Sequence, residues 1–187
     1  MSTPRVVLVG PMGAGKSTVA ELLGARWGLP VRDTDRDVEA AAGKPIAEIF
    51  VDDGEAAFRS LERSAVLEAL RTHPGALALG GGAVLDPVVC EALRGHTVVF
   101  LEVGLSDAVK RVGLGVGRPL LLGNVRSRVK QLLDERLPVY RSVARYTVLT
   151  DGRTPEQVAE EVAALVEPAG PVESPVESPA ESPAEER

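Results

Sequence analysis

Short runs of β-branched and aliphatic residues alternate along this chain with longer segments in which apolar side chains recur at helical spacing. A short uninterrupted apolar run is typical of a strand that is buried on both faces of a parallel sheet. We predict such strands at residues 6–9, 29–32, 76–79, 97–101 and 146–149. The intervening segments begin or end at capping residues, glycines or prolines, and they predict helices at 18–28, 36–42, 45–51, 53–72, 86–93, 106–112, 126–137, 139–145 and from 154 onward.

This alternation of strands and helices predicts an α/β fold, in which a parallel sheet carries helices on both of its faces. Such sheets bind ligands beyond the carboxyl ends of their strands. Glycine-rich or acidic segments follow the first three predicted strands, so we expect the three loops to meet at one crevice. A break is also expected at Pro138, which should separate helix 126–137 from helix 139–145.

The first predicted strand leads directly into a glycine-rich loop, which reads GPMGAGKS at residues 10–17. The loop fits the pattern G-x-x-x-x-G-K-[ST] at every fixed position and has the strand before it and the helix after it that this pattern requires. Glycines let backbone N–H groups turn toward a phosphate chain, and the helix N-terminus adds a positive dipole. We expect Lys16 at the β- and γ-phosphates and the Ser17 hydroxyl on Mg²⁺. The residues expected to bind the nucleotide in this segment are Gly13, Ala14, Gly15, Lys16, Ser17 and Thr18.

Composition narrows the class of protein further. The net charge is −6 over 187 residues, but residues 168–187 carry five glutamates against one arginine, which leaves −2 for residues 1–167. A nearly balanced domain offers no basic surface to nucleic acid. No apolar stretch is long enough to span a membrane, and the single cysteine, Cys90, fits a reducing compartment. We expect a cytoplasmic monomer that binds neither nucleic acid nor membranes.

The end of the chain differs in kind from the rest. Residues 171–186 consist of four tetrapeptides, PVES, PVES, PAES and PAEE. Such a segment has too few apolar side chains to offset the entropy cost of ordering it. We therefore divide the chain into a folded domain at 1–167 and a disordered tail at 168–187 that has no catalytic part.

Two groups of charged residues outside the P-loop could carry chemistry. Asp33 and Asp35 stand at the end of the second predicted strand with side chains in alternate directions. They could reach a metal ion and a substrate hydroxyl, or they could cap the next helix. Arg59 lies on a predicted helix between Glu55 and Glu62. It could belong to a surface ladder of ion pairs, or Glu62 could aim it at an anionic substrate.

Two glycine-rich segments are further candidates. Gly80-Gly81-Gly82 follows the third predicted strand, and we favour close contact with a ligand over a plain turn because consecutive glycines cost backbone entropy. Arg118 lies among alternating glycines in segment 113–123, which we interpret as a mobile lid that brings Arg118 to the transferring phosphate. The alternative is a mobile connection with an ordinary exposed arginine.

These motifs together resemble those of the shikimate kinase family over nearly all of residues 1–167. Beyond the P-loop, which many families share, the resemblance rests on motifs that follow one another in the family's order. They are Asp33-Thr34-Asp35; Phe50-x-x-x-Gly54-Glu55-x-x-Phe58-Arg59-x-x-Glu62; Gly80-Gly81-Gly82-Ala83; Arg118-Pro119-Leu120-Leu121; and Arg136-x-Pro138-x-Tyr140. The resemblance implies a three-layer P-loop kinase fold, with a five-stranded parallel sheet flanked by helices and a mobile lid.

The resemblance also implies transfer of the ATP γ-phosphate to the 3-hydroxyl of shikimate. Lys16, Asp35 and Arg118 would be catalytic, with Asp35 holding the ring hydroxyls and orienting or deprotonating the one that attacks. The shikimate carboxylate would be held by Arg59, Arg136 and the backbone of Gly81. Mg²⁺ would be bound by Ser17 and Asp33, and adenine would be contacted by Arg111 and Arg153.

Other activities remain open at the level of sequence. Another small-molecule P-loop kinase, acting on gluconate or a nucleoside monophosphate, would need different motifs on the acceptor side. A GTPase is disfavoured because the chain has no N-K-x-D base-reading motif. A non-catalytic nucleotide-binding regulator is also possible, although Lys16, Ser17, Asp33, Asp35 and Arg118 are all present.

Overall fold

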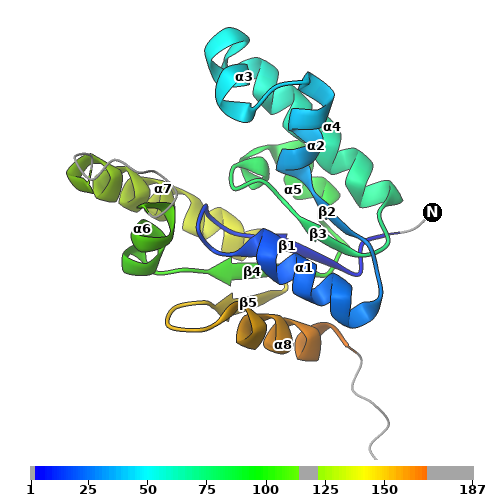
Figure 1. Cartoon of the computed structure of the whole chain (residues 1–187). Coiled ribbons are helices and arrows are strands. Elements are labelled where there is room, and N and C mark those ends of the chain that lie inside the picture. The colour runs from blue at the N-terminus through cyan, green and yellow to red at the C-terminus, as the bar shows by residue number, and fades with distance from the viewer. Residues whose placement is uncertain (1–2, 114–121, 168–187) are drawn as a thin grey trace, which may run out of the picture.

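The protein, represented by a computed structural model that describes residues 3–113 and 122–167, is built around a five-stranded sheet (Figure 1). Every paired neighbour is parallel, and the strand order is β2-β3-β1-β4-β5. The strands are β1 (Val6–Val9), β2 (Val31–Asp33), β3 (Ala76–Ala78), β4 (Val98–Glu102) and β5 (Tyr146–Leu149). The predicted α/β fold with a parallel five-stranded sheet is therefore confirmed.

Strand β1 lies at the centre of the sheet, between β3 and β4. Its four residues are at most 1% exposed, as expected for an apolar run that is covered on both faces. A central parallel strand delivers the loop that follows it to the middle of the carboxyl-end edge. The P-loop is therefore placed between the loops that follow β3 and β4.

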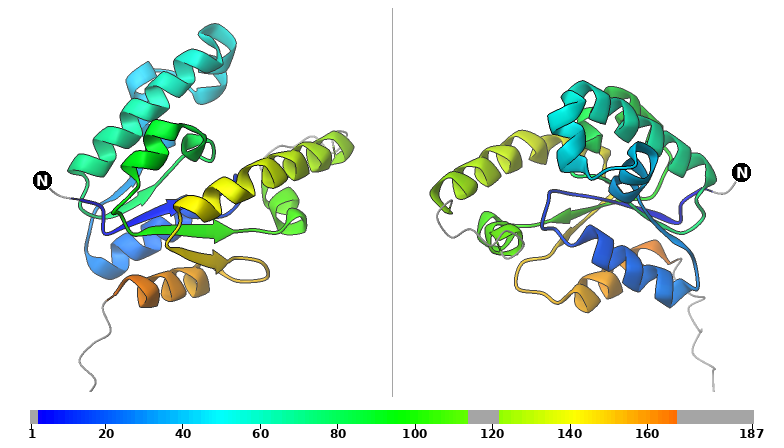
Figure 2. Two further views of the ribbon diagram at one scale, coloured as in Figure 1. Left: turned by 180° about the vertical axis from the view of Figure 1, so that it is seen from behind. Right: turned by 45° about the horizontal axis from the view of Figure 1, so that its top comes forward.

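Helices cover both faces of the sheet, which gives three layers (Figure 2). Helices α1 and α8 pack on one face, and α4, α5 and the second half of α7 pack on the other. The helices are α1 (Lys16–Trp27), α2 (Thr34–Ala42), α3 (Ile46–Asp52), α4 (Gly54–Thr72), the 3₁₀ turn η1 (Ala83–Leu85), α5 (Pro87–Ala92), α6 (Leu105–Gly113), α7 (Leu122–Val143) and α8 (Pro155–Val166). None of the helices in the described ranges combines the length and the apolar character needed to cross a bilayer.

Helices α2 and α3 and the start of α4 project beyond the sheet as a separate arm (Figure 1). The arm has a small core of its own, formed by Val38, Ile49 and Phe58. Because α4 begins in this arm and ends against the sheet, it connects the two parts rigidly. The arm forms one wall above the carboxyl ends of the strands.

The predicted break at Pro138 is wrong, because α7 runs through this residue without interruption. A proline inside a helix removes one backbone hydrogen bond and costs about 3 kcal/mol. Packing opposes that cost here: Leu137 and Val139 lie against the core, and Tyr140 is 1% exposed within it. Tertiary contacts on both sides of the proline therefore hold the helix together.

The expected placement of Asp35 at the end of a strand is also wrong. Strand β2 ends at Asp33, and helix α2 begins at Thr34, so Asp35 lies in the first turn of a helix. The Asp33 carboxylate caps that helix by accepting the backbone N–H of Asp35 at 3.0 Å. The capping interpretation of Asp33 therefore holds, and it does not remove either aspartate from the crevice.

Two predicted segments cannot be compared with the structure. Residues 114–121, which include Arg118 and most of the expected lid, lie outside the described residues, and so does the tail at 168–187.

Candidate active site

The loops after β1, β2 and β3 meet at the carboxyl-end edge of the sheet and enclose a cavity of about 740 Å³. The arm closes it on one side and α7 on the other. Its polar lining contains all the described residues for which the sequence predicts catalysis, metal binding or acceptor binding: Lys16, Ser17, Asp33, Asp35, Arg59, Gly81 and Arg136. The expected convergence of three loops on one crevice is therefore observed.

The P-loop has the conformation of an anion-binding turn. Gly15 caps helix α1 with φ +87°, a left-handed conformation that favours glycine, and no described side chain caps this helix. At Gly10, an added Cβ would lie 2.6 Å from the carbonyl oxygen of Leu101. The glycines thus allow tight packing against β4, and the first N–H groups of α1 remain available to a phosphate group.

Lys16 folds back over this loop. Its Nζ donates to the carbonyl oxygens of Gly10 at 2.8 Å and Pro11 at 3.0 Å. Burial lowers the pKa of Lys16 to about 8, although the carboxylates of Asp35 and Asp33 oppose that shift. An arriving phosphate adds negative charge beside this partly desolvated ammonium, which raises the pKa of Lys16 toward its ordinary value.

Ser17 and Asp33 lie side by side beneath the cavity. The Ser17 hydroxyl donates to Oδ2 of Asp33 at 2.6 Å, while Oδ1 of Asp33 holds the Asp35 N–H. Both are oxygen ligands of the kind that Mg²⁺ prefers. Within residues 3–113 and 122–167, no three His, Cys, Asp or Glu side chains gather into a metal site. The pair therefore fits a Mg²⁺ ion that takes most of its ligands from phosphates and water.

The pKa of the Asp35 carboxyl group is shifted in a way that bears on catalysis. Burial, reinforced by the charges of Asp33 and Glu62, raises the pKa of Asp35 to about 6, while Lys16 opposes the shift. A carboxylate with this pKa is ionised at neutral pH and is a stronger base than an ordinary aspartate. Asp35 can therefore accept a proton or a hydrogen bond from a hydroxyl in the cavity.

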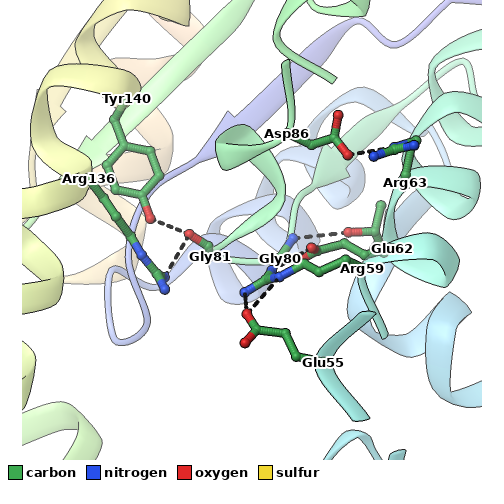
Figure 3. Close-up of polar contacts among 10 residues, drawn as sticks. Glu55, Arg59, Glu62, Arg63, Gly80, Gly81, Asp86, Arg136 and Tyr140 are labelled. Atoms are coloured by element: carbon green, nitrogen blue, oxygen red, sulfur yellow. Dashed lines mark hydrogen bonds and ion pairs between the residues drawn. The ribbon is translucent and has the colours of Figure 1, made fainter. Parts of the chain in front are cut away.

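The sequence left two roles open for Arg59, a ladder of ion pairs and a place at the substrate site, and the structure is consistent with both. Its guanidinium pairs with Glu62 at 2.6 Å and with Glu55 at 3.3 Å, so the ion-pair ladder exists (Figure 3). Glu62 is only 3% exposed, and burial raises its pKa even though the bond to Arg59 opposes that shift. Because Arg59 also lines the cavity, the buried glutamate acts as the anchor that fixes its guanidinium at the cavity wall.

Arg136 reaches the same cavity from α7. Its Nη1 donates to the carbonyl oxygen of Gly81 at 3.2 Å, and the Tyr140 hydroxyl donates to that same oxygen (Figure 3). The Nε of Arg136 is buried and finds no acceptor among the described residues. An unpaired buried donor is costly, so this nitrogen indicates where an anionic ligand can bind.

The sequence predicts that the Gly80-Gly81-Gly82 segment is rich in glycine because a ligand approaches it closely. The structure shows another reason for two of the three glycines. An added Cβ at Gly80 would lie 2.4 Å from Oδ1 of Asp35, and one at Gly82 would lie 2.4 Å from Nη1 of Arg59. At Gly81 the nearest atom would be 3.4 Å away, an ordinary contact. The outer glycines thus make room for site side chains, whereas a side chain at the middle one would lie in ordinary contact with the P-loop backbone at Met12 and Gly10.

A second, smaller cavity of about 220 Å³ adjoins the P-loop and holds the remaining predicted residues, Arg111 and Arg153. Arg111 donates to the carbonyl oxygen of Gly13 at 3.1 Å and to Thr150 at 2.9 and 3.1 Å. Arg153 is held by Glu161 at 2.5 Å and by two backbone carbonyls. Gly15, Thr18 and Arg111 line both cavities, so the two cavities are neighbours on either side of the P-loop.

Two carboxylates fasten the loops around this smaller cavity. Asp151 accepts the N–H of Gly104 at 2.8 Å, and Asp107 accepts the N–H of Gly152 at 3.0 Å. The loops after β4 and β5 thus hold each other by a reciprocal exchange of hydrogen bonds. No local sequence pattern predicts these two bonds, because each joins residues more than 40 positions apart.

Sequence reasoning missed other parts of the site as well. The apolar walls of the larger cavity come from the arm and from α7, through Ile46, Phe50, Phe58, Val129, Leu132 and Leu133. Thr34 is fully buried, and its Oγ1 accepts the Gly80 N–H at 3.0 Å. Thr34, Phe50 and Phe58 stand in motifs quoted from the sequence, but those motifs did not indicate a loop contact or a cavity wall, because the fold brings these residues together.

The comparisons with known proteins agree with this geometry. A family described as "Shikimate kinase" matches residues 12–167. Shikimate kinase of Salinispora arenicola is 62% identical over 87% of this chain and 98% of that protein. Shikimate kinase of Thermobifida fusca is 54% identical over 90% of this chain and 98% of its own length.

Solved structures give the same result. The structure of shikimate kinase from Acinetobacter baumannii in complex with shikimate superposes with a TM-score of 0.81, at 33% identity over 89% of this chain and 93% of that one. The P-loop, the parallel sheet and the sequence relatives therefore agree, and this chain belongs to the shikimate kinase family of ATP-dependent kinases.

Proposed function

We propose that this protein transfers the γ-phosphate of ATP to the 3-hydroxyl of shikimate, giving 3-phosphoshikimate and ADP. One observation carries the proposal: Lys16, Asp35, Arg59 and Arg136 come from four separate elements and line a single cavity. A phosphate cradle at one end and two guanidinium groups at the other match a triphosphate and a small acid bearing one carboxylate.

The nucleotide occupies the P-loop and the smaller cavity. Residues 13–18 surround its phosphates, since their backbone N–H groups lie at the start of α1. Lys16 leaves the carbonyls of Gly10 and Pro11 for the β- and γ-phosphates. The base enters the smaller cavity, where Arg111 and Arg153 are already held in place by Thr150 and Glu161.

Ser17 and Asp33 hold Mg²⁺, which neutralises charge on the β- and γ-phosphates when it is bound. The 2.6 Å contact between the two side chains supports this assignment, because both oxygens then face one point. Asp33 keeps its second oxygen on the Asp35 N–H, which fixes its orientation.

The acceptor occupies the larger cavity, with its carboxylate at Arg59 and Arg136 and against the backbone of Gly81. The unpartnered Nε of Arg136 supports this orientation, as does the anchoring of Arg59 by Glu62. The carboxylate then supplies the acceptor that the buried Nε lacks. The apolar walls exclude water around the ring.

Asp35 orients the attacking hydroxyl and removes its proton. A pKa of about 6 keeps Asp35 ionised at neutral pH while making it basic enough to accept that proton. Arg118, which lies outside the described residues, is assigned to the transferring phosphate on sequence grounds alone. Catalysis then consists of positioning and charge neutralisation, as phosphoryl transfer requires.

The same proposal extends to the setting in which the protein works. In this proposal the protein acts as a monomer in the cytoplasm, and Cys90, the sole cysteine, fits such a reducing compartment. Sedimentation velocity of the purified chain would test the monomeric state.

A panel of acceptors tests the function directly. ADP release is measured with ATP, Mg²⁺ and one of shikimate, gluconate or AMP, and the Lys16→Ala variant serves as a control for contaminating kinases. Shikimate alone should stimulate turnover, and the control should be inactive. Stimulation by gluconate or AMP without shikimate would refute the assignment, and hydrolysis of ATP without any acceptor dependence would also contradict it.

A further inference from the structure

Two side chains of α7 converge on the carbonyl oxygen of Gly81, a residue that lines the larger cavity. Arg136 donates to it at 3.2 Å, and Tyr140, one helical turn further on, donates its hydroxyl to it. Residues four positions apart share one face of a helix, so the two donors reach the loop from the same side. The pair joins α7 to a segment 55 and 59 positions away in sequence.

Tyr140 itself is held firmly. Its side chain is 1% exposed, and its ring stacks on Phe100 of β4 with the centroids 5.0 Å apart and the planes 16° apart. Burial raises the pKa of its hydroxyl, so this group is a neutral donor throughout the physiological range. A donor fixed in the core by an aromatic stack is well suited to fix the loop that it contacts.

The loop needs such a tether. Three consecutive glycines have more accessible backbone conformations than any other tripeptide, so this segment has the largest freedom to lose when an acceptor binds. Steric room for Asp35 and Arg59 requires Gly80 and Gly82, so the chain cannot stiffen the segment by adding side chains there. Rigidity has to come from hydrogen bonds.

Fixing the Gly81 carbonyl group also fixes the direction of the next backbone donor, the N–H group of Gly82. The peptide group between Gly81 and Gly82 is planar, so the direction of the carbonyl sets the direction of the Gly82 N–H. Neither this N–H nor that of Gly81 meets an acceptor within the part of the chain that the structure describes. Both residues line the cavity. The tether therefore fixes the direction of the Gly82 N–H, which is opposite to that of the carbonyl, and restricts the movement of the segment that carries the Gly81 N–H.

We propose that Tyr140 is a positioning residue for the acceptor site: its hydroxyl tethers the Gly80–Gly82 segment and so pre-organises the donors that receive the carboxylate of the acceptor. This inference rests on the proposed function for the identity of the acceptor. The hydroxyl does not touch the nucleotide side, and its removal should leave that side unchanged. Binding to a pre-organised site is tighter because less conformational entropy is lost.

The test is the Tyr140→Phe variant, which keeps the ring and its stack on Phe100 and removes only the oxygen. We expect its KM for shikimate to rise about five- to tenfold, as the loss of one buried hydrogen bond implies. Its KM for ATP should stay within about twofold of the wild-type value. The Leu70→Ala variant is the matched control, because Leu70 is buried in the same hydrophobic core and lines neither cavity; it should lower Tm and leave the KM for shikimate nearly unchanged.

A readout without substrate separates this inference from the proposed function. The N–H groups of Gly80 and Ala83 are protected by Thr34 and by the Gly80 carbonyl, so hydrogen exchange at residues 79–85 reports on the tether. Exchange there should be faster in Tyr140→Phe than in the wild type and in Leu70→Ala. Unchanged exchange, an unchanged KM for shikimate, or equal rises in both KM values would overturn the inference. A wild type without shikimate kinase activity, combined with faster exchange in Tyr140→Phe, would refute the proposed function and leave the tether standing.

Discussion

The two ends of the site are built in opposite ways. On the nucleotide side, one contiguous segment, residues 10–18, supplies the phosphate cradle through its backbone. On the acceptor side, Asp35, Arg59, Gly81 and Arg136 come from α2, α4, the loop after β3 and α7. The first end depends on local backbone conformation, and the second depends on the relative placement of four elements.

The supporting contacts differ in the same way. The cradle is kept open by glycines at positions of positive φ, such as Gly15. The acceptor side is held by long-range contacts from behind, with Glu62 on Arg59 and Tyr140 on Gly81. We therefore expect substitutions behind the acceptor side to change the KM for shikimate and not that for ATP, whereas the phosphate cradle depends mainly on its own glycines. The predictions below test that separation, beginning with the largest effect.

Asp35→Asn should reduce kcat by about three orders of magnitude, because the amide cannot take the proton of the attacking hydroxyl. Affinity for ADP, measured by calorimetry, should change less than about threefold, since we assign Asp35 to the acceptor and its side chain makes no hydrogen bond with the described P-loop residues. An equal loss of nucleotide affinity would mean that Asp35 belongs to the other end of the site.

Gly80→Ala should lower kcat about a hundredfold, because its Cβ would lie 2.4 Å from Asp35 and displace the carboxylate from its position. Gly81→Ala is the matched control, since its Cβ meets nothing closer than 3.4 Å and its effect should be within about fivefold. Neither glycine has positive φ, so alanine introduces no backbone strain at either position. Equal activity of the two variants would contradict the role assigned to Gly80.

Arg136→Ala should raise the KM for shikimate between about tenfold and a hundredfold, because a charge-assisted bond to the acceptor carboxylate is lost. Arg153→Ala provides the comparison at the opposite end: it should raise the KM for ATP and leave that for shikimate unchanged. Steady-state kinetics with each substrate varied in turn distinguishes the two patterns. A change confined to ATP in Arg136→Ala would assign Arg136 to the nucleotide side.

The pH dependence of kcat/KM for shikimate should report the pKa of Asp35. The ionised carboxylate is the active form, so the rate should be level at neutral pH and should fall tenfold for each pH unit below about 6. An ordinary aspartate would place the fall near pH 4. A profile without a break between pH 5 and 7 would contradict the raised pKa.

Stability provides a second measure of the same pKa. Since the folded-state pKa of Asp35 is raised above its unfolded value, this group favours folding most below pH 4, and the contribution is lost as pH rises through about 6. Asparagine does not ionise, so the Asp35→Asn variant does not lose this stability as the pH rises. It should therefore unfold at higher denaturant concentration than the wild type at pH 8, and the difference should disappear near pH 3.5.

Deletion of residues 168–187 should have the smallest effect, with kcat and both KM values unchanged. The tail has the composition of a disordered segment, and the family match ends at residue 167. Thermal unfolding of the shortened chain should also be unchanged. A severalfold loss of turnover would show that the tail takes part in catalysis.

The contrast between the two ends also explains what the sequence could predict. The strand, loop and helix of the P-loop are determined by neighbouring residues, so periodicity and glycine spacing predicted them correctly. Two predictions were wrong. Asp35 was expected at the end of a strand and lies in a helix, and a helix break was expected at Pro138, where the helix is unbroken. In the first case the Asp33 cap starts the helix early, and in the second the packing around Tyr140 outweighs the missing hydrogen bond.

The acceptor side was predicted through its charged residues and not through what supports them. Spacing placed Arg59 beside Glu62, but no pattern showed that Gly80 and Gly82 make room for Asp35 and Arg59. The contact of Tyr140 with Gly81 spans 59 positions, and it exists only once α7 has packed on the sheet. Such contacts depend on the fold, which local sequence patterns do not report.

The central claim is that one cavity receives a nucleotide at the P-loop and a small acid opposite it. A crystal structure of the protein with ADP, Mg²⁺ and shikimate tests this most directly. The account predicts a shikimate carboxylate within about 3 Å of the guanidinium groups of Arg59 and Arg136, and a ring hydroxyl at Asp35 that faces the β-phosphate of ADP. Shikimate bound elsewhere, or turned with its carboxylate toward Lys16, would contradict it.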